Sequence, residues 1–236
     1  MRLENTCAIV TGGGRGIGRC TAIQLASSGV RVVVTARSEG ELQGVVGEIQ
    51  SAGGAAIARV ADVTDPDRIR AVAAEAIDLY GGVDILVNNA GVAIHNPISK
   101  IRMEDWDQNI AVNLTGTFIC TQAVFQHMCE RGSGHVVNIS SVSGVTGHND
   151  GGAYCASKWG VVGFTEVTNV EGRPHGVKAS VVCPGPVDTR MRRENHPDDV
   201  LEKLTQPESI AEAVLNLLKQ PAEAHTVQMI VRTPLM

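Results

Sequence analysis

Tyr154 and Lys158 lie four residues apart in the segment GGAYCASKWG, residues 151–160, of a chain with only two tyrosines. Residues at this spacing share one face of a helix, and many such pairs are purely structural. The pair can also perform acid–base chemistry, because a nearby ammonium lowers the pKa of a phenol, which is otherwise about 10. The other motifs of the chain must decide between these two readings.

A glycine-rich segment, TGGGRGIG at residues 11–18, follows the first apolar run. Glycines at a strand-to-helix turn let the backbone approach a pyrophosphate, which the N-terminal amides of the next helix bind. The glycines at positions 12, 16 and 18 depart from the usual G-x-G-x-x-G spacing, and a structural turn is the alternative. Their position between a β-branched run and a helical stretch favours dinucleotide binding.

Short apolar runs alternate with longer helical patterns along the whole chain. Apolar runs without polar alternation are typical of strands covered on both faces, as in a parallel sheet. The alternation predicts an α/β fold with a doubly wound parallel sheet of about seven strands, in a single domain spanning 1–236. The predicted strands are 6–11, 30–36, 55–61, 83–89, 134–140, 177–183 and 226–231. The predicted helices are 16–28, 38–52, 66–80 (capped by Thr64 or Asp65), 104–131, 152–171 and 208–219.

The region 184–206 is irregular and rich in proline and charge. Ligands of doubly wound sheets bind outside the carboxyl ends of the strands, so a mobile segment there would form a substrate lid. An ordinary surface connection is the alternative.

Composition excludes several classes of function. The net charge of −5, without a basic cluster, argues against a nucleic-acid partner. The sequence shows neither a leader pattern nor an apolar run near 18 residues, so we expect neither secretion nor membrane insertion. The six cysteines form no C-x-x-C pair and no zinc-like spacing with histidine. We therefore expect a reduced cytoplasmic protein without disulfides or a metal site.

Six motifs occur in an order and at intervals that resemble the short-chain dehydrogenase/reductase family, over residues 6 to about 190. They are TGGGRGIG, NNAG at 88–91, Asn113, Ser141, Tyr154-x-x-x-Lys158 and PGPVDT at 184–189. The resemblance implies one Rossmann-type domain with a seven-stranded parallel sheet, usually in a homotetramer or a dimer.

The resemblance also implies roles for four residues. Tyr154 would be the general acid that protonates a carbonyl oxygen as hydride arrives, and Lys158 would lower its pKa and contact the nicotinamide ribose. Ser141 would hydrogen-bond the substrate carbonyl, with Ser140 as the competing hydroxyl. Asn113 would hold a water beside the lysine; without the other three residues it would read as a surface amide.

Further residues match the cofactor contacts of the family: Asp62 and Val63 at the adenine, the NNAG motif at the ribose and diphosphate, and PGPVDT at the nicotinamide and phosphate. The complete predicted set is Gly12, Gly14, Arg15, Gly16, Ile17, Gly18, Arg37, Asp62, Val63, Asn89, Ala90, Gly91, Tyr154, Lys158, Pro184, Gly185, Val187 and Thr189.

The end of the second predicted strand indicates the preferred nucleotide. An NAD site places a carboxylate there, about 20 residues past the glycines, for the ribose 2′-hydroxyl. Here the residue is Ala36, followed by Arg37, which can pair with a 2′-phosphate; Arg15 is a second candidate cation. The sequence therefore predicts NADPH over NADH. In the alternative, both arginines are solvated and Glu39 serves the ribose.

Three functions stay open. The first is NADPH-dependent interconversion of a ketone or aldehyde with its alcohol. The second is reduction of a 3-oxoacyl group on an acyl carrier protein, because the chain resembles bacterial 3-oxoacyl-carrier-protein reductases. Its ending, HTVQMIVRTPLM, lacks their V-D-G-G and looks more like NADP-dependent carbonyl and hydroxy-acid dehydrogenases. The third, a non-catalytic nucleotide-binding regulator, usually lacks the serine, tyrosine or lysine, and all three occur here.

Several other side chains carry expectations. His95 and His148 are candidates for the substrate cleft, and Arg190, Arg192 and Arg193 could steer an acidic carrier or a carboxylate substrate, or be solvated. Cys155 could be reactive, because Lys158 is close in sequence. We expect Trp106 and Trp159 to pack against helices rather than to serve as stacking platforms. An apolar set on the two long helices predicts subunit contacts: Ile110, Val112, Phe118, Ile119, Val124, Val161, Val162 and Phe164.

Overall fold

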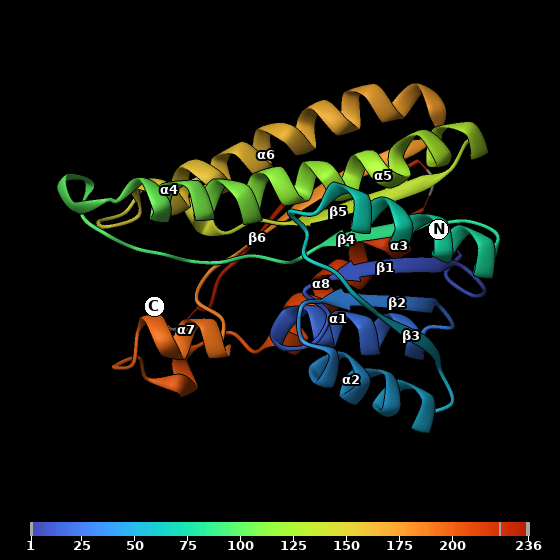
Figure 1. Cartoon of the computed structure of the whole chain (residues 1–236), viewed down its shortest axis with the longest axis horizontal. Helices are drawn as coiled ribbons and strands as arrows, with labels where there is room; N and C mark the ends of the chain where they lie inside the picture. Colours follow the sequence, from blue (N-terminus) through green and yellow to red (C-terminus); the bar gives the residue numbers. More distant parts are fainter. Residues whose placement is uncertain (1, 222, 235–236) are drawn as a thin grey trace.

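The computed structural model describes residues 2–221 and 223–234. Seven parallel strands form one sheet in the order β3-β2-β1-β4-β5-β6-β7 (Figure 1). The strands are β1 (Cys7–Thr11), β2 (Arg31–Ala36), β3 (Ala55–Val60), β4 (Ile85–Asn88), β5 (Gly134–Ile139), β6 (Val177–Pro184) and β7 (Gln228–Val231). All seven predicted strands are present, so the doubly wound parallel sheet is confirmed.

The strand order creates the position of the site. The chain builds β1, β2 and β3 outward in one direction, then returns to pair β4 with the other side of β1. Ala8 pairs with Val32 on one side and with Ile85 on the other. The loops that follow β1 and β4 therefore leave the sheet in opposite directions, and the crevice between them is where ligands of such folds bind.

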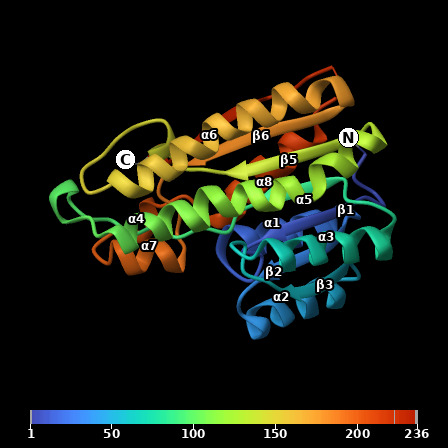
Figure 2. The same ribbon diagram turned by 45° about the horizontal axis from the view of Figure 1, so that its top comes forward.

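Helices cover both faces of the sheet, as Figures 1 and 2 show. On one face lie α1 (Gly16–Ser27), α2 (Glu39–Ser51) and α8 (Pro207–Lys219), which share a core cluster with Val10 and Val34. On the other face lie α3 (Pro66–Tyr80), α5 (Gly116–Arg131) and α6 (Gly152–Gly172), over Ile9, Leu86 and Val181. Successive strand residues face opposite sides, so both faces of each central strand are apolar.

The predicted helix 104–131 is interrupted in the structure. It consists of α4 (Met103–Asn109), a π-helical turn η2 (Ile110–Thr115) and α5. Residue patterns do not distinguish a π-turn from an α-turn, and such turns often occur at functional sites. Here the turn contains Asn113, one of the four predicted catalytic residues.

The region 184–206 is more ordered than its composition suggests. It contains α7 (Arg190–Asn195) and the 3-10 turn η5 (Leu201–Lys203). Thr189 caps α7 by accepting a hydrogen bond from the Arg192 amide at 3.2 Å. The ends of the region are joined, because the Asp188 amide donates to the Thr205 carbonyl at 2.9 Å. A helix of six residues is too short to produce a periodic sequence pattern.

Several smaller expectations can also be compared with the structure. Asp65, rather than Thr64, caps α3 by accepting from the Arg68 amide at 3.0 Å. All six cysteines are free thiols. The described helices include none with the length and apolar character of a membrane span. The last two residues of the ending HTVQMIVRTPLM lie outside the described residues.

Candidate functional site

The glycine loop after β1 is shaped for close backbone approach. Gly12 and Gly16 have φ angles of 62° and 53°, in the left-handed region that favours glycine. A Cβ atom on Gly18 would lie 2.3 Å from the carbonyl oxygen of Gly12, so only glycine fits there. In the described structure, Arg15 makes no side-chain cap to α1, and the first turn of α1 carries no acidic residue. Its N-terminal amides are therefore available to an anion.

The NNAG motif after β4 fastens this loop. The Asn89 side-chain amide donates to the carbonyl oxygens of Thr11 and Gly12 at 3.0 and 3.1 Å. The Thr11 hydroxyl accepts in turn from the amides of Asn89 and Ala90 at 3.0 and 3.1 Å. These bonds fix the two loops of the crevice to each other.

Tyr154 and Lys158 lie on α6, with the lysine Nζ 5.8 Å from the centre of the phenol ring. Nζ donates to the Ile139 carbonyl oxygen at 3.0 Å, and burial lowers the pKa of Lys158 to about 8. Burial raises the pKa of Tyr154 above its usual value, although a hydrogen bond with Ser141 and the charge of Arg192 oppose this. Loss of phenolate hydration is the largest influence here, and Lys158 is not among the groups that shift the Tyr154 pKa. The lowering expected from Lys158 together with a positively charged nicotinamide stays a prediction.

The two adjacent serines have different surroundings. The Ser140 hydroxyl is buried and donates to the Lys158 carbonyl oxygen at 2.9 Å, so it is used within the fold. Ser141 caps the 3-10 turn η3 (Val142–Gly144), accepts from the Ser143 amide at 3.1 Å and hydrogen-bonds the Tyr154 phenol. The geometry thus favours Ser141 over Ser140 as the hydroxyl that acts with Tyr154.

Asn113 is fully buried and all its side-chain polar atoms are bonded. Its Oδ1 accepts from the Val92 amide at 2.8 Å, while Nδ2 donates to the Val92 carbonyl oxygen at 2.9 Å and to Ser157 Oγ at 3.0 Å. This side chain joins the π-turn to α6 and to the loop that follows NNAG. The reading of Asn113 as a surface amide is wrong.

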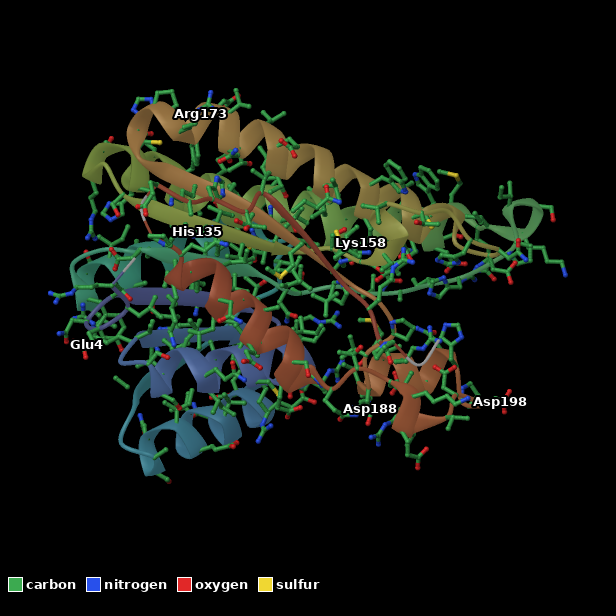
Figure 3. All side chains as sticks on the ribbon, turned by 180° about the vertical axis from the view of Figure 1, so that it is seen from behind. Glu4, His135, Lys158, Arg173, Asp188 and Asp198 are labelled. Carbon is green, nitrogen blue, oxygen red and sulfur yellow. The ribbon has the colours of Figure 1, made fainter. Side chains whose placement is uncertain are left out.

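A cavity of about 340 Å³ lies beside these residues, which is within the range of ligand pockets. Of the four predicted catalytic residues, Tyr154 and Lys158 line it, whereas Ser141 and Asn113 do not. Fourteen of the predicted cofactor residues line it: Gly12, Gly14, Arg15, Gly16, Ile17, Arg37, Asp62, Val63, Asn89, Ala90, Gly91, Tyr154, Lys158 and Thr189. Ten further residues outside the predicted cofactor set also line it: Ala36, Ser38, Glu41, Ala61, Val92, Val112, Ile139, Ser140, Arg190 and Met191. Of these, the sequence had singled out Ala36 at the nucleotide end, Ser140 as the competing hydroxyl and Arg190 as a cation near the substrate. Figure 3 shows Lys158 and Asp188 in the same half of the molecule, opposite His135 and Glu4.

Four predicted cofactor residues do not line the cavity. Gly18 lies beneath the glycine loop. The Gly185 amide donates to the Val231 carbonyl oxygen at 2.7 Å, just past Pro184 at the end of β6, and the buried Val187 pairs with Thr205. These residues hold the cavity wall and the start of the region 184–206 in place.

At the β2 end of the cavity, Ala36 lines the wall and no carboxylate ends the strand. Arg37 and Arg15 are exposed; Arg37 lies 4.0 Å from Asp62, and Arg15 lies 3.4 Å from Glu41. Glu39 is not among the lining residues of the described structure. Glu41, which lines the cavity two positions later, had no signal in the sequence beyond its place in the first turn of α2.

Asp62 is held in place within its own loop. Its Oδ1 accepts from the Thr64 amide and hydroxyl at 2.9 and 2.7 Å. Burial would raise the pKa of Asp62, but these hydrogen bonds and the charge of Arg37 keep it below its ordinary value.

The opposite end of the cavity borders a group of histidines. The His95 ring meets the Tyr154 ring edge-on, with 5.1 Å between their centres, and lies 5.6 Å from His148. His95 therefore lies beside the candidate acid and His148 lies beside His95, but neither lines the cavity of the described structure, so their place in a substrate cleft stays a prediction. His196 in the region 184–206, with its ring 6.0 Å from that of His95, was missed because nothing in the sequence placed this region beside the loop of His95.

Comparisons with known proteins agree with this architecture. A sequence model of the family described as short chain dehydrogenase matches residues 6–200. A 3-oxoacyl-[acyl-carrier-protein] reductase from Synechocystis sp. is 38% identical over 92% of this chain and 91% of its own. The reductase FabG of the same description from Thermotoga maritima is 34% identical over 98% and 97%.

A solved structure extends the likeness to three dimensions. The crystal structure of a metagenomic short-chain oxidoreductase in complex with NADP superposes with a TM-score of 0.87, at 36% identity and over the full length of both chains. The glycine loop, the strand order and these matches together lead to one conclusion: the chain belongs to the short-chain dehydrogenase/reductase family of oxidoreductases.

Proposed function

We propose that this protein uses NADPH to transfer hydride between the nicotinamide and the carbonyl or hydroxyl carbon of a ketone, aldehyde or secondary alcohol. The observation that carries the proposal is the joint position of Tyr154, to which Ser141 hydrogen-bonds, and the buried Lys158 at one end of a cavity whose other end is a glycine loop and a free helix N-terminus. One domain would then supply both the cofactor site and the reacting groups.

The cavity fits a dinucleotide in its chemistry. The amides of α1 suit a diphosphate, and a Cβ atom at Gly91 would lie 3.0 Å from Asn113 Oδ1, which indicates how closely the wall is built there. Asn89, Ala90 and Gly91 would hold the ribose and diphosphate side, and Asp62 and Val63 the adenine side. When bound, NADPH supplies the hydride.

The choice of NADPH rests on the charges at the end of β2. A 2′-phosphate would meet no carboxylate at Ala36 and would find the guanidinium of Arg37 nearby, with Arg15 as a second cation of the cavity wall. The planar fork of arginine suits phosphate oxygens. The NADP found with the structural relative supports the same choice.

The proton steps follow from the surroundings of Tyr154. Because its pKa lies above the usual value, the phenol is protonated at neutral pH and can donate to a carbonyl oxygen. The Ser141 hydroxyl, which bonds the phenol, would orient that oxygen. Lys158 would stabilise the phenolate left after transfer, and its own pKa of about 8 keeps it mostly charged at pH 7.

Asn113 would act through its main chain. Both polar atoms of its side chain are engaged by Val92 and Ser157. Its carbonyl oxygen accepts from the Thr117 hydroxyl at 2.7 Å and has a second lone pair for a water. That water would carry protons between Lys158 and solvent.

The second candidate function is reduction of a carrier-bound 3-oxoacyl group. It is favoured by the two relatives described as 3-oxoacyl-[acyl-carrier-protein] reductases. The lid cations do not add to this case, because Arg190 pairs with Glu194 and Arg193 with Asp188. Comparing a free 3-oxoacyl thioester with the same group on a carrier protein separates the two functions.

Assembly is part of the proposal. Val124 and Val161, predicted to contact a partner, are buried within the subunit instead. The exposed apolar side chains on α5 and α6 are Phe118, Trp159, Val167 and Val170. Trp159 and Trp106 are 52% and 37% exposed, so each packs only partly within the subunit. Covering this face would require a partner, and we propose a homotetramer, or a dimer. Light scattering that finds only a monomer at micromolar concentration would contradict this.

The reaction is tested with a panel of ketones and aldehydes and either NADPH or NADH, followed at the nicotinamide absorbance band. We expect oxidation of NADPH with at least one carbonyl compound and a slower reaction with NADH. Absence of both nucleotide binding and turnover across the panel would refute the proposed function.

A further inference from the structure

Three segments meet around the ring of His95: its own loop, the segment with His148, and the region 184–206. Hydrogen bonds join the loop of His95 to each of the other two. His95 lies on the loop after β4, where the Asn96 amide donates to the Asp150 carbonyl oxygen at 2.9 Å, next to the segment that carries His148. The lid joins the same loop, because Asn195 Nδ2 donates to the Ala93 carbonyl oxygen at 3.0 Å. Figures 1 and 2 both show α7 at the end of the molecule where α4 and α6 begin.

His148 and His95 differ in the hydrogen bonds that their rings form. His148 is satisfied: Nδ1 donates to the Asn149 carbonyl oxygen at 2.8 Å, and Nε2 therefore accepts from the Ser143 hydroxyl at 2.9 Å. The half-buried ring of His95 forms no hydrogen bond with any described residue, although it lies against the Tyr154 ring. A ring nitrogen in that position is available to a ligand that reaches Tyr154.

Arg192 supplies a second available donor. Its Nε donates to Asp199, while its two terminal nitrogens have no hydrogen-bond partner among the described residues. Its side chain is 25% exposed, and its terminal nitrogens are not among the buried unpaired atoms of the described residues, so they are open to a ligand that enters from solvent. Its charge lies close enough to Tyr154 and His95 to influence the pKa of both.

The charges around His95 favour an anion in this place. Burial lowers the pKa of His95, and the neighbouring His148, His196 and Arg192 lower it further, while Asp150 opposes them. The ring is therefore neutral at pH 7 and next to a fixed cation. A negatively charged group placed between them would accept from Arg192 and would stabilise the protonated ring.

We propose that His95 and Arg192 bind a carboxylate of the carbonyl substrate, so that the enzyme prefers oxo acids to neutral ketones and acyl thioesters. This inference rests on the proposed function, because it assigns the substrate class of the same site. His95 and Arg192 are binding residues in this assignment and take no part in proton transfer to the carbonyl oxygen.

Binding of the oxo acid is then coupled to protonation of His95. Because the free site has a lowered pKa and the occupied site a raised one, the complex takes up a proton between these two values. The affinity for the acid falls as pH rises through that interval, by up to about tenfold per pH unit. A neutral methyl ester of the same acid shows no such dependence.

The test compares 2-oxobutanoate and 3-oxobutanoate with their methyl esters, and with a 3-oxobutanoyl thioester, all with NADPH. Hydrogen bonds to charged groups are worth about tenfold to a hundredfold in affinity, and we expect kcat/KM to favour at least one acid over its ester by that factor. His95→Gln and Arg192→Gln should each remove most of the preference, mainly by raising KM for the acid.

Two matched variants control for indirect effects. His175→Gln changes an exposed histidine beyond α6, and Arg193→Gln changes the neighbouring lid cation, which pairs with Asp188. Both should keep the acid-to-ester ratio. Calorimetry of oxo-acid binding to the protein saturated with NADP, in buffers of different ionisation enthalpy, should detect proton uptake that His95→Gln abolishes.

Equal use of acid and ester, or a preference for the ester or the thioester, would overturn the assignment while leaving the proposed function intact. Equal losses for acid and ester in His95→Gln and Arg192→Gln would also overturn it. Absence of NADPH binding and of turnover with every carbonyl compound would instead refute the proposed function, and this inference with it.

Discussion

The two ends of the cavity differ in how far their functional side chains are buried and held by hydrogen bonds. At the Tyr154 end, Lys158 is 5% exposed and bonded to a main-chain carbonyl, and Asn113 makes three hydrogen bonds within the fold. At the β2 end, Arg37 is 70% exposed and Arg15 is 56% exposed, each with a carboxylate 3.4–4.0 Å away.

The difference explains what each end can do. Buried groups held by hydrogen bonds have one geometry before substrate arrives, and this preorganisation is what acid–base chemistry requires. Exposed cations are screened by water and salt, and they contribute affinity for a phosphate rather than precise orientation. Substitutions at the first end should therefore affect rate and stability strongly, and those at the second should affect cofactor affinity moderately.

The largest effect is expected for Tyr154→Phe, which removes the proton donor and keeps the ring that His95 contacts. Loss of a general acid typically costs about 10²–10⁴-fold in rate. Tyr80→Phe, at the other tyrosine of the chain, serves as the control and should retain activity. Near-normal turnover by the Tyr154 variant, with chemistry rate-limiting, would remove the phenol from the mechanism.

The next effect concerns stability at the same end. Asn113→Ala leaves the amide and carbonyl of Val92 without their partner and removes one of the two hydrogen bonds of the Ser157 hydroxyl, which still donates to the Tyr154 carbonyl oxygen. Each unsatisfied buried group costs on the order of 1–3 kcal/mol, so urea unfolding should show a loss of several kcal/mol. The exposed amide Gln122, replaced by alanine, should change stability by less than about 0.5 kcal/mol. Similar small losses for both variants would show that the Asn113 bonds matter little.

A smaller effect is expected at the β2 end. Arg37→Ala should weaken NADPH binding about tenfold to a hundredfold and leave NADH nearly unchanged, with Arg15→Ala weaker in the same direction. Ala36→Asp should shift the preference toward NADH by repelling the phosphate. Arg19→Ala is the control, since Arg19 pairs with Glu48 outside the cavity. Dissociation constants measured for both nucleotides decide this, and equal losses for both would refute the role of Arg37.

The smallest effect distinguishes Cys155 from the buried cysteines. Burial raises the pKa of Cys7 and of Cys120 to about 12, which makes both thiols inert near neutral pH. Cys155 is half-buried on α6, one residue from Tyr154. Mild alkylation followed by mass spectrometry should label Cys155 before Cys7 or Cys120, and less in the presence of NADPH. If Cys155 stays unlabelled in the protein without nucleotide, it has no special reactivity.

The sequence predicted the fold and most of the cavity for clear physical reasons. Apolar runs mark strands buried on both faces, and the glycines at 12 and 18 mark a turn where a Cβ atom has no space. The family resemblance added Ser141 and Asn113, which no local pattern would single out. Tyr154 and Lys158 needed only their spacing on a helix.

What the sequence missed depends on contacts between distant segments. Glu41 lines the cavity because of where α2 packs, and His196 lies near His95 because of where the region 184–206 packs. Neither residue belongs to a sequence motif. The π-turn at Asn113 and the six-residue helix α7 are set by tertiary hydrogen bonds rather than by residue periodicity. The rise of the Tyr154 pKa was missed, because burial cannot be read from the spacing of two residues.

In the proposed function, the Tyr154 end of the cavity sets the rate and the β2 end, with Arg37, sets the affinity for the cofactor. The most direct test is a double-mutant cycle of Tyr154→Phe and Arg37→Ala, with turnover at saturating NADPH and the NADPH dissociation constant measured for all four proteins. We expect Tyr154→Phe to lower only the rate and Arg37→Ala to weaken only NADPH binding, and the double variant should combine both effects within about twofold. Weak NADPH binding in the Tyr154 variant, or a slow saturated rate in the Arg37 variant, would contradict this division between the two ends.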